Sequence, residues 1–310
     1  MDSKKKNQWK AWLYLLPALI ILAIFTVWPI INTLRMAFLK DYNELGLIGG
    51  QKFEFGFDNF VNVTKYRGFV NCLGNTMILC LVTVPISTML ALIIAVALNS
   101  IKFIRRTMQT IFFLPYVTNS IAIGMVFMAM FSMVKGYAGQ EGSIGIINTI
   151  IEAFGGTRIN WVNPNSSKAA NMAVLIIYIV WNALPFKILV LLGGLQSVNK
   201  QYYEAAKVDG TSRIRSVWRI TVPLLSAMIA YVVITSFIGG FKEYTSIVGI
   251  FGENMGPIGS KNVLNTMVGY IYQSLDNNQG RASAAALILF AIIFAVTMVN
   301  MYVSKKKVHY

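Results

Sequence analysis

Six separate stretches, each of more than twenty mostly apolar residues, constrain this chain more than any other feature. The hydrocarbon core of a bilayer is about 30 Å thick, and a helix needs about 20 residues to cross it. Only 13% of the residues are charged, so little of the chain can face water. The sequence therefore predicts an all-α polytopic membrane protein. Its six transmembrane helices are expected at residues 11–34, 75–98, 107–134, 170–195, 222–250 and 283–303.

The segments between these stretches alternate in charge. One set carries fifteen Lys and Arg residues against three acidic residues, and the other set carries ten against eight. Lys and Arg accumulate on the cytoplasmic side of membrane proteins, so both chain ends are predicted to be cytoplasmic. The expected organisation is a cytoplasmic tail at 1–10, one membrane domain at 11–304, and a cytoplasmic tail at 305–310.

Several chemistries lack the residues that they need. The only histidine is His309, so a His-based metal site or a Ser-His-Asp triad is not expected. No phosphate-binding Gly-x-x-x-x-Gly-Lys-Ser/Thr string occurs. The net charge of +15 could indicate nucleic acid, but the basic residues form short clusters between apolar runs. We therefore expect no enzyme activity, no cofactor, no metal and no nucleic-acid partner.

The longest cytoplasmic loop, at 196–221, joins the fourth and fifth stretches. Good helix formers precede Gly210, which takes a left-handed backbone at low cost and so ends the first of two short helices. Thr211 or Ser212 supplies the N-cap of the second helix. From its residues alone, this loop is either an amphipathic connector on the membrane surface or a small helix that enters a groove on another protein.

The same loop contains a spaced string of residues: Glu204, Ala205, Ala206, Asp209, Gly210, Ile220 and Pro223. This string resembles the EAA loop of permease subunits from binding-protein-dependent ABC importers. The wider context, over about residues 70–305, is similar to the maltose-permease-like carbohydrate branch of that family. Gly193-Gly194-Leu195 and the segment 280–286 are part of this similarity.

The resemblance implies a type I ABC importer permease fold in a bacterial-type plasma membrane, with membrane lipid around it. A second homologous permease subunit, in a heterodimer, would form the other half of a translocation pathway for a sugar or oligosaccharide. Two cytoplasmic ATP-binding subunits would drive it, and an extracellular solute-binding protein would deliver the cargo. The resemblance assigns ATPase coupling to Glu204, Ala205, Ala206, Asp209 and Gly210.

Three charged residues lie inside the apolar stretches: Lys187, Lys242 and Glu243. Charges at such depth are candidates for functional roles. The depths of Lys187 and Glu243 differ by roughly 20 Å along straight helices, so we do not expect them to pair. Lys187 is expected to extend toward the cytoplasmic surface, whereas Glu243, which follows two glycines, is expected to line a pathway.

A set of aromatic, amide, hydroxyl and glycine residues in the fourth and fifth stretches suits a neutral saccharide. Trp181, Asn182 and Ser236 have similar predicted depths near the middle of the membrane. The alternative is ordinary helix packing, in which Ser and Gly allow close approach. The candidate pathway residues are Tyr178, Trp181, Asn182, Ser236, Gly239, Gly240 and Glu243.

Two other functions stay open at this point. A glycerol-phosphate ester or another polar solute could be the cargo, but a phosphate would favour several cations in the pathway. A secondary transporter would explain the spans but not the loop, and many such folds show an inverted repeat that is not visible here.

Overall fold

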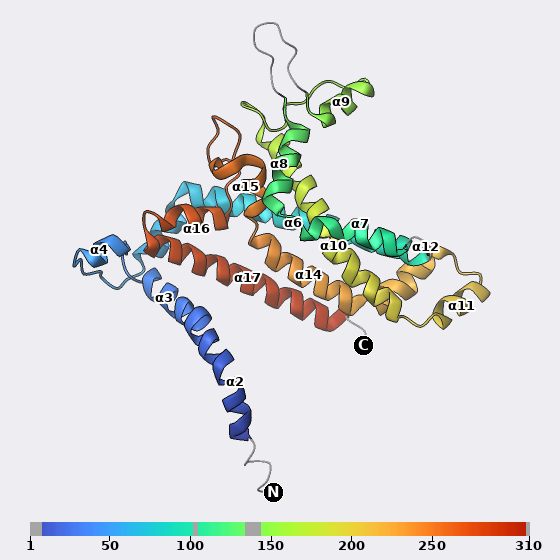
Figure 1. Ribbon diagram of the computed structural model, residues 1–310, viewed down its shortest axis with the longest axis horizontal. Coiled ribbons are helices and arrows are strands. Elements are labelled where there is room, and N and C mark those ends of the chain that lie inside the picture. Colours follow the sequence, from blue (N-terminus) through green and yellow to red (C-terminus); the bar gives the residue numbers. More distant parts are fainter. Residues whose placement is uncertain (1–7, 102–104, 134–143, 308–310) are drawn as a thin grey trace. The chain divides into compact units, whose positions relative to one another are not determined.

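The computed structural model describes residues 8–101, 105–133 and 144–307 (Figure 1). All regular elements within these ranges are helices, and two isolated β-bridges join Leu39 to Phe55 and Met133 to Ile144. The predicted all-α class is therefore confirmed. Most of the predicted N-terminal tail and the end of the C-terminal tail lie outside the described residues.

The number of membrane spans is between four and six. Six are obtained when each of two sharply bent helix pairs is counted as one span, and the sequence predicted neither bend. The continuous spans are Trp12–Ala37, Arg67–Ser100, Lys168–Ser197 and Gln279–Lys306. The bent pairs are Thr110–Val117 with Ser120–Phe131, at 103°, and Arg213–Leu224 with Ser226–Phe241, at 72°.

The chain divides into two compact units, which are described separately. The first unit comprises Met1–Phe69 and Tyr270–Phe290. It contains one long N-terminal helix with a π-helical turn, two short helices, most of α16 and the beginning of α17. These elements are α2 (Gln8–Leu22), η1 (Ala23–Val27), α3 (Trp28–Ala37), α4 (Glu44–Ile48), α5 (Asp58–Lys65), α16 (Met267–Leu275) and α17 (Gln279–Lys307).

A buried asparagine organises the first unit. The Asn59 side-chain amide donates hydrogen bonds to the carbonyls of Ala37 and Leu39, at 3.1 and 2.7 Å. Its carbonyl oxygen accepts from the Asp41 backbone N–H at 3.1 Å. Asp41 in turn forms an ion pair with Arg281, with 2.9 Å between the guanidinium and the carboxylate. These contacts fix the end of the first span to the start of α17.

The second unit comprises Val70–Gly269 and Ala291–Tyr310. It carries the remaining spans and both features that the sequence singled out, the polar residues of the fourth and fifth spans and the loop between them. Its helices before that loop are α6 (Arg67–Ser100), α7 (Arg105–Val117), α8 (Ser120–Phe131), α9 (Ile146–Ala153) and α10 (Lys168–Ser197). From the loop onward they are α11 (Gln201–Val208), α12 (Arg213–Ser216), η2 (Val217–Thr221), α13 (Val222–Leu224), α14 (Ser226–Phe241), α15 (Thr245–Phe251) and η3 (Gly252–Asn254).

The break between α7 and α8 has a local cause. The Asn119 side-chain oxygen accepts from the backbone N–H groups of Ile121 and Ala122, at 2.9 and 3.4 Å. This is an N-cap, so a new helix begins at Ser120. The stretch predicted as a span at 107–134 is therefore not one straight helix, and it is one span when the bent pair is counted as one.

The stretch predicted as a span at 222–250 is likewise not one continuous helix, because α14 ends at Phe241. The Lys242 and Glu243 N–H groups turn back to the carbonyls of Gly239 and Gly240, at 3.0 and 3.2 Å. Such bonds between residues three apart close the last turn of a helix. The Glu243 carboxylate then accepts from the Ser246 N–H at 3.1 Å, which stabilises the first turn of α15.

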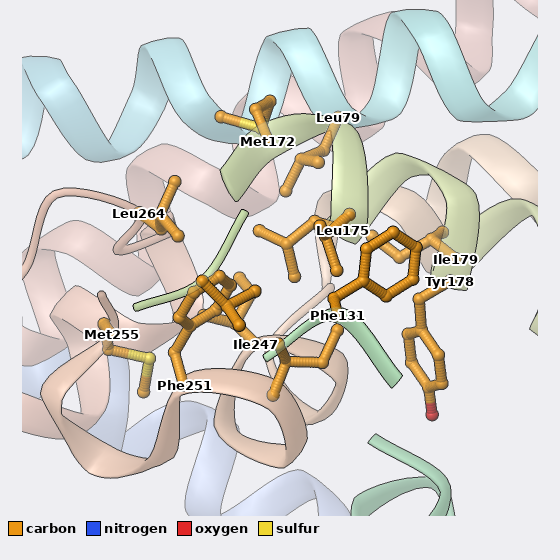
Figure 2. Close-up of a cluster of buried hydrophobic side chains, with 13 residues drawn as sticks. Leu79, Phe131, Met172, Leu175, Tyr178, Ile179, Ile247, Phe251, Met255 and Leu264 are labelled. Carbon is orange, nitrogen blue, oxygen red and sulfur yellow. The ribbon is translucent and has the colours of Figure 1, made fainter. Parts of the chain in front are cut away.

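A cluster of buried apolar side chains lies where α8, α10 and α15 meet (Figure 2). Leu175, Ile247 and Phe131 are among its buried members. α8 and α15 approach backbone to backbone, since a Cβ added at Gly124 would lie 2.7 Å from the Gly249 Cα. Only glycine permits this approach.

Candidate functional site

One pocket in the second unit brings together polar side chains from five helices. Its volume is about 390 Å³, and its lining combines hydroxyl, amide and aromatic groups with one ammonium and one carboxylate. α6, α7, α8, α10 and α14 all contribute. The lining residues are Thr83, Val84, Ser87, Tyr116, Ser120, Ile179, Asn182, Ala183, Phe186, Lys187, Thr235, Ser236, Gly239, Gly240 and Glu243.

Five of the seven candidate pathway residues line this pocket. They are Asn182, Ser236, Gly239, Gly240 and Glu243. Asn182 and Ser236 come from α10 and α14, and the pocket brings these two spans together. Tyr178 and Trp181 are not among the lining residues. Contact between any of the seven and a substrate stays a prediction.

Tyr178 and Trp181 belong instead to an aromatic group centred on Phe127. The ring centroids of Tyr178 and Trp181 lie 4.9 and 5.4 Å from that of Phe127. Figure 2 shows the Tyr178 hydroxyl pointing away from the other labelled side chains. It donates a 2.6 Å hydrogen bond to the Ser120 carbonyl. Because Ser120 lines the pocket, Tyr178 supports the wall of the pocket from α10.

The expectation for Lys187 is wrong. Its side chain does not extend to the surface, since the residue is only 3% exposed. The ammonium donates to the Ser87 hydroxyl at 2.6 Å and to the Thr88 hydroxyl at 3.1 Å. Two hydroxyl acceptors on α6 therefore replace water around this charge, which removes the reason for the side chain to leave the membrane interior.

Lys187 and Glu243 line the same pocket, although counting along straight helices placed them far apart in depth. The 72° bend in the fifth span and the end of α14 at Phe241 explain the error. No ion pair joins the two side chains in the described part of the chain. The depth argument behind the expectation that they do not pair is therefore wrong.

The sequence reasoning missed several lining residues. Tyr116 and Phe186 stack, with ring centroids 6.0 Å apart and planes 19° from parallel. On α6, Thr83 and Ser87 both face the pocket. A signal was available for the second pair, because two hydroxyl residues four positions apart share one face of an otherwise apolar helix.

The loop at 196–221 is built from short-range hydrogen bonds. At the end of α11, the Gly210 and Thr211 N–H groups donate to the carbonyls of Lys207 and Ala206, at 3.1 and 2.9 Å. This pair of bonds is a Schellman motif, and Gly210 has the left-handed backbone that the motif requires, with φ of +67°. Ser212 caps α12 with a 3.4 Å bond from the Arg215 N–H. The predicted turn and helix start are thus present.

The loop exposes most of the residues assigned to coupling. Glu204, Ala205, Asp209 and Gly210 are exposed, whereas Ala206 is only 7% exposed because the chain itself covers it. The Tyr203 hydroxyl lies 3.1 Å from that of Thr221 and ties α11 to η2. A partner protein could therefore reach four of the five residues to which the resemblance assigns coupling.

Metal ligation finds no support in the described ranges, where no group of three or more His, Cys, Asp or Glu side chains is suitably placed. Cys72 and Cys80 are buried, and both are free thiols.

Residues 70–309 match the family of inner membrane components of binding-protein-dependent transport systems. The chain belongs to this family. The matched region thus includes the pocket, the loop at 196–221 and five of the six expected spans.

Curated relatives cover nearly the whole permease. The arabinooligosaccharides transport system permease protein AraP of Bacillus subtilis is 28% identical over 300 residues, which are 94% of this chain and 88% of that protein. The lactose transport system permease protein LacF of Rhizobium radiobacter is 30% identical over 293 residues, with 93% and 91% covered.

A solved structure has the same fold. It is that of a bacterial alginate ABC transporter in complex with alginate pentasaccharide-bound periplasmic protein. One of its chains matches the permease with a TM-score of 0.78 and 21% identity, and the match covers 98% of this chain and 96% of that chain. The expected ABC importer permease fold is therefore confirmed.

Proposed function

We propose that this permease forms half of the translocation pathway for a saccharide and holds the cargo in the pocket described above. The observation that carries the proposal is the meeting of Asn182 and Ser236, from two different spans, in one polar pocket. The stacked pair Tyr116 and Phe186 adds flat apolar surface to the same lining.

Saccharides need both kinds of surface. Their C–H faces pack against aromatic rings, and their hydroxyl groups exchange hydrogen bonds with amides and hydroxyls. The names of the two relatives described above refer to arabinooligosaccharides and to lactose, and the solved structure is that of an alginate transporter. A saccharide cargo agrees with all three.

A glycerol-phosphate ester fits the lining less well. Charge-assisted recognition of a phosphate favours several cations. The described lining holds one cation, Lys187, together with one carboxylate, Glu243. We therefore prefer an uncharged sugar to the phosphate ester.

Membership in the family supports the rest of the proposed assembly. A second homologous permease completes the pathway, two ATP-binding subunits contact the loop near Glu204, and an extracellular solute-binding protein delivers the sugar. Both chain ends are cytoplasmic in this arrangement, with tails at 1–10 and 305–310 around a membrane domain at 11–304. The permease contributes no catalytic residue, because ATP is hydrolysed by its partners.

ATP-driven uptake in reconstituted vesicles, with the partner subunits and a panel of radiolabelled oligosaccharides, tests the proposal. Asn182→Ala and Ser236→Ala should each lower uptake two- to tenfold, since a hydrogen bond contributes about 0.5–1.5 kcal/mol. Ser100→Ala is the control, because Ser100 lies at the exposed end of α6 and bonds only within that helix. Uptake at the parental rate in both pocket variants would contradict the pocket assignment.

A further inference from the structure

We infer that Lys187 and Glu243 form a balanced pair of opposite charges that makes the pocket selective for uncharged cargo. The inference rests on the proposed function of the pocket and adds the charge class of the saccharide. It also assigns to Lys187 a role that sequence reasoning did not give it.

Within the described residues, no carboxylate contacts the Lys187 ammonium to balance its positive charge. Its two acceptors are the hydroxyl oxygens of Ser87 and Thr88. Each hydroxyl already donates its hydrogen to its own helix, Ser87 to the Thr83 carbonyl and Thr88 to the Val84 carbonyl. Both oxygens can therefore only accept from Lys187, and they add no negative charge.

One hydrogen of this ammonium is left for a ligand. A lysine ammonium has three N–H donors, and two of them are used by α6. Lys187 lines the pocket, and no third acceptor contacts its Nζ within the described ranges. A sugar oxygen in the pocket can take the third hydrogen.

Glu243 is the complementary group. One of its carboxylate oxygens accepts from the Ser246 N–H at 3.1 Å, and this bond holds the side chain at the start of α15. The other oxygen has no partner among the described residues, and Glu243 also lines the pocket. This oxygen can accept a hydrogen from a sugar hydroxyl.

Among the described residues, the pocket lining therefore carries one positive charge, one negative charge and no other charged side chain. A neutral polyhydroxylated molecule offers acceptors to Lys187 and donors to Glu243 at the same time. A carboxylated or phosphorylated molecule would gain from Lys187 but meet repulsion from Glu243, and a cationic molecule would meet the reverse. At low dielectric such repulsion is strong enough to discriminate.

The test measures the charge preference of the pocket with small thiol reagents of opposite charge. The reporter is Ser236→Cys, a near-isosteric change at a half-buried lining residue, in a protein in which both native cysteines are replaced by alanine. The permease, assembled with its partners in nanodiscs, is treated with anionic sulfonatoethyl methanethiosulfonate or cationic trimethylammonioethyl methanethiosulfonate. The measured quantity is the ratio of the anionic to the cationic reaction rate.

Removing the positive charge and removing the negative charge should shift this ratio in opposite directions. Lys187→Met leaves Glu243 alone and should lower the ratio about tenfold, whereas Glu243→Gln leaves Lys187 alone and should raise it by a similar factor. The double variant should return to the parental ratio, and Lys187→Arg should keep it. A purely structural role for Lys187 predicts no such reversal.

Three results would overturn the inference. These are a ratio that changes less than twofold in both single variants, a change in the same direction in both, and a reporter that reacts with neither reagent. The uptake experiment above is independent of this one. If no saccharide is taken up but the two single variants still shift the rate ratio in opposite directions, only the proposed cargo is rejected. If saccharide uptake is observed but the rate ratio does not shift in this way, only the charge pair is rejected.

Discussion

The loop at 196–221 and the pocket are built in opposite ways. In the loop, the bonds that set the backbone join near neighbours, such as Thr211 to Ala206 and Arg215 to Ser212. In the pocket, hydrogen bonds join residues that are far apart in the sequence: Lys187 and Ser87 are 100 residues apart, and Tyr178 and Ser120 are 58 apart. A loop of the first kind can form wherever its sequence occurs, whereas the pocket exists only after several spans have packed together.

This difference predicts how far the effect of a substitution extends through the structure. A change in the loop should alter contact with a partner and leave the membrane helices folded. A change that separates the helices around the pocket should destabilise the whole second unit, because the apolar cluster beside the pocket draws on the same helices. Three substitutions, taken in order of expected effect, test this contrast.

The largest effect is expected from Gly124→Val. The added Cβ would lie 2.7 Å from the Gly249 Cα, and backbone cannot move aside as a flexible side chain can. Overpacking of this kind costs about 3 kcal/mol at the upper end of its usual range. We expect a large fall in the melting temperature of the purified assembly and a low yield in the membrane.

The matched control for this prediction is Gly193→Val. Gly193 lies inside α10 and is exposed, and a Cβ added there would meet no heavy atom within 4 Å. Equal melting temperatures for the two valine variants would show that close approach of α8 and α15 does not hold the unit together.

The same contrast explains what the sequence could and could not predict. Apolar length predicted the helical class, and the position of Gly210 and Ser212 predicted the turn and the cap in the loop, because these depend on local residues. The bends in the third and fifth spans were missed, although Asn119 offered a capping signal inside an apolar run. The burial of Lys187 could not be predicted, because its acceptors lie on a helix one hundred residues earlier.

A smaller effect is expected from Ser87→Ala. It removes the nearer of the two acceptors of Lys187 and leaves a buried N–H of a charged group without a partner. Such a loss costs about 2 kcal/mol, so the melting temperature should fall by less than in Gly124→Val. Ser100→Ala, at the exposed end of the same helix, should leave it unchanged. If the two alanine variants have the same melting temperature, the hydrogen bond between Lys187 and Ser87 does not stabilise the fold.

The smallest effect on stability, and the most specific effect on coupling, is expected from Gly210→Ala. A Cβ in the left-handed backbone at φ of +67° costs about 1 kcal/mol, so the end of α11 should shift while the membrane helices stay folded. Binding of the purified ATPase subunit and ATP-driven uptake should both decrease.

The control variant Gly155→Ala separates backbone strain from the role in coupling, because Gly155 has a φ of +79° and equally open surroundings but lies outside the loop. It should cost similar stability and leave ATPase binding intact. Gly210→Asn should recover part of the binding, since asparagine tolerates this conformation better than alanine. If Gly210→Ala and Gly155→Ala affect ATPase binding equally, the loop is not the coupling element, and its exposed face at Glu204 would then belong to a connector on the membrane surface.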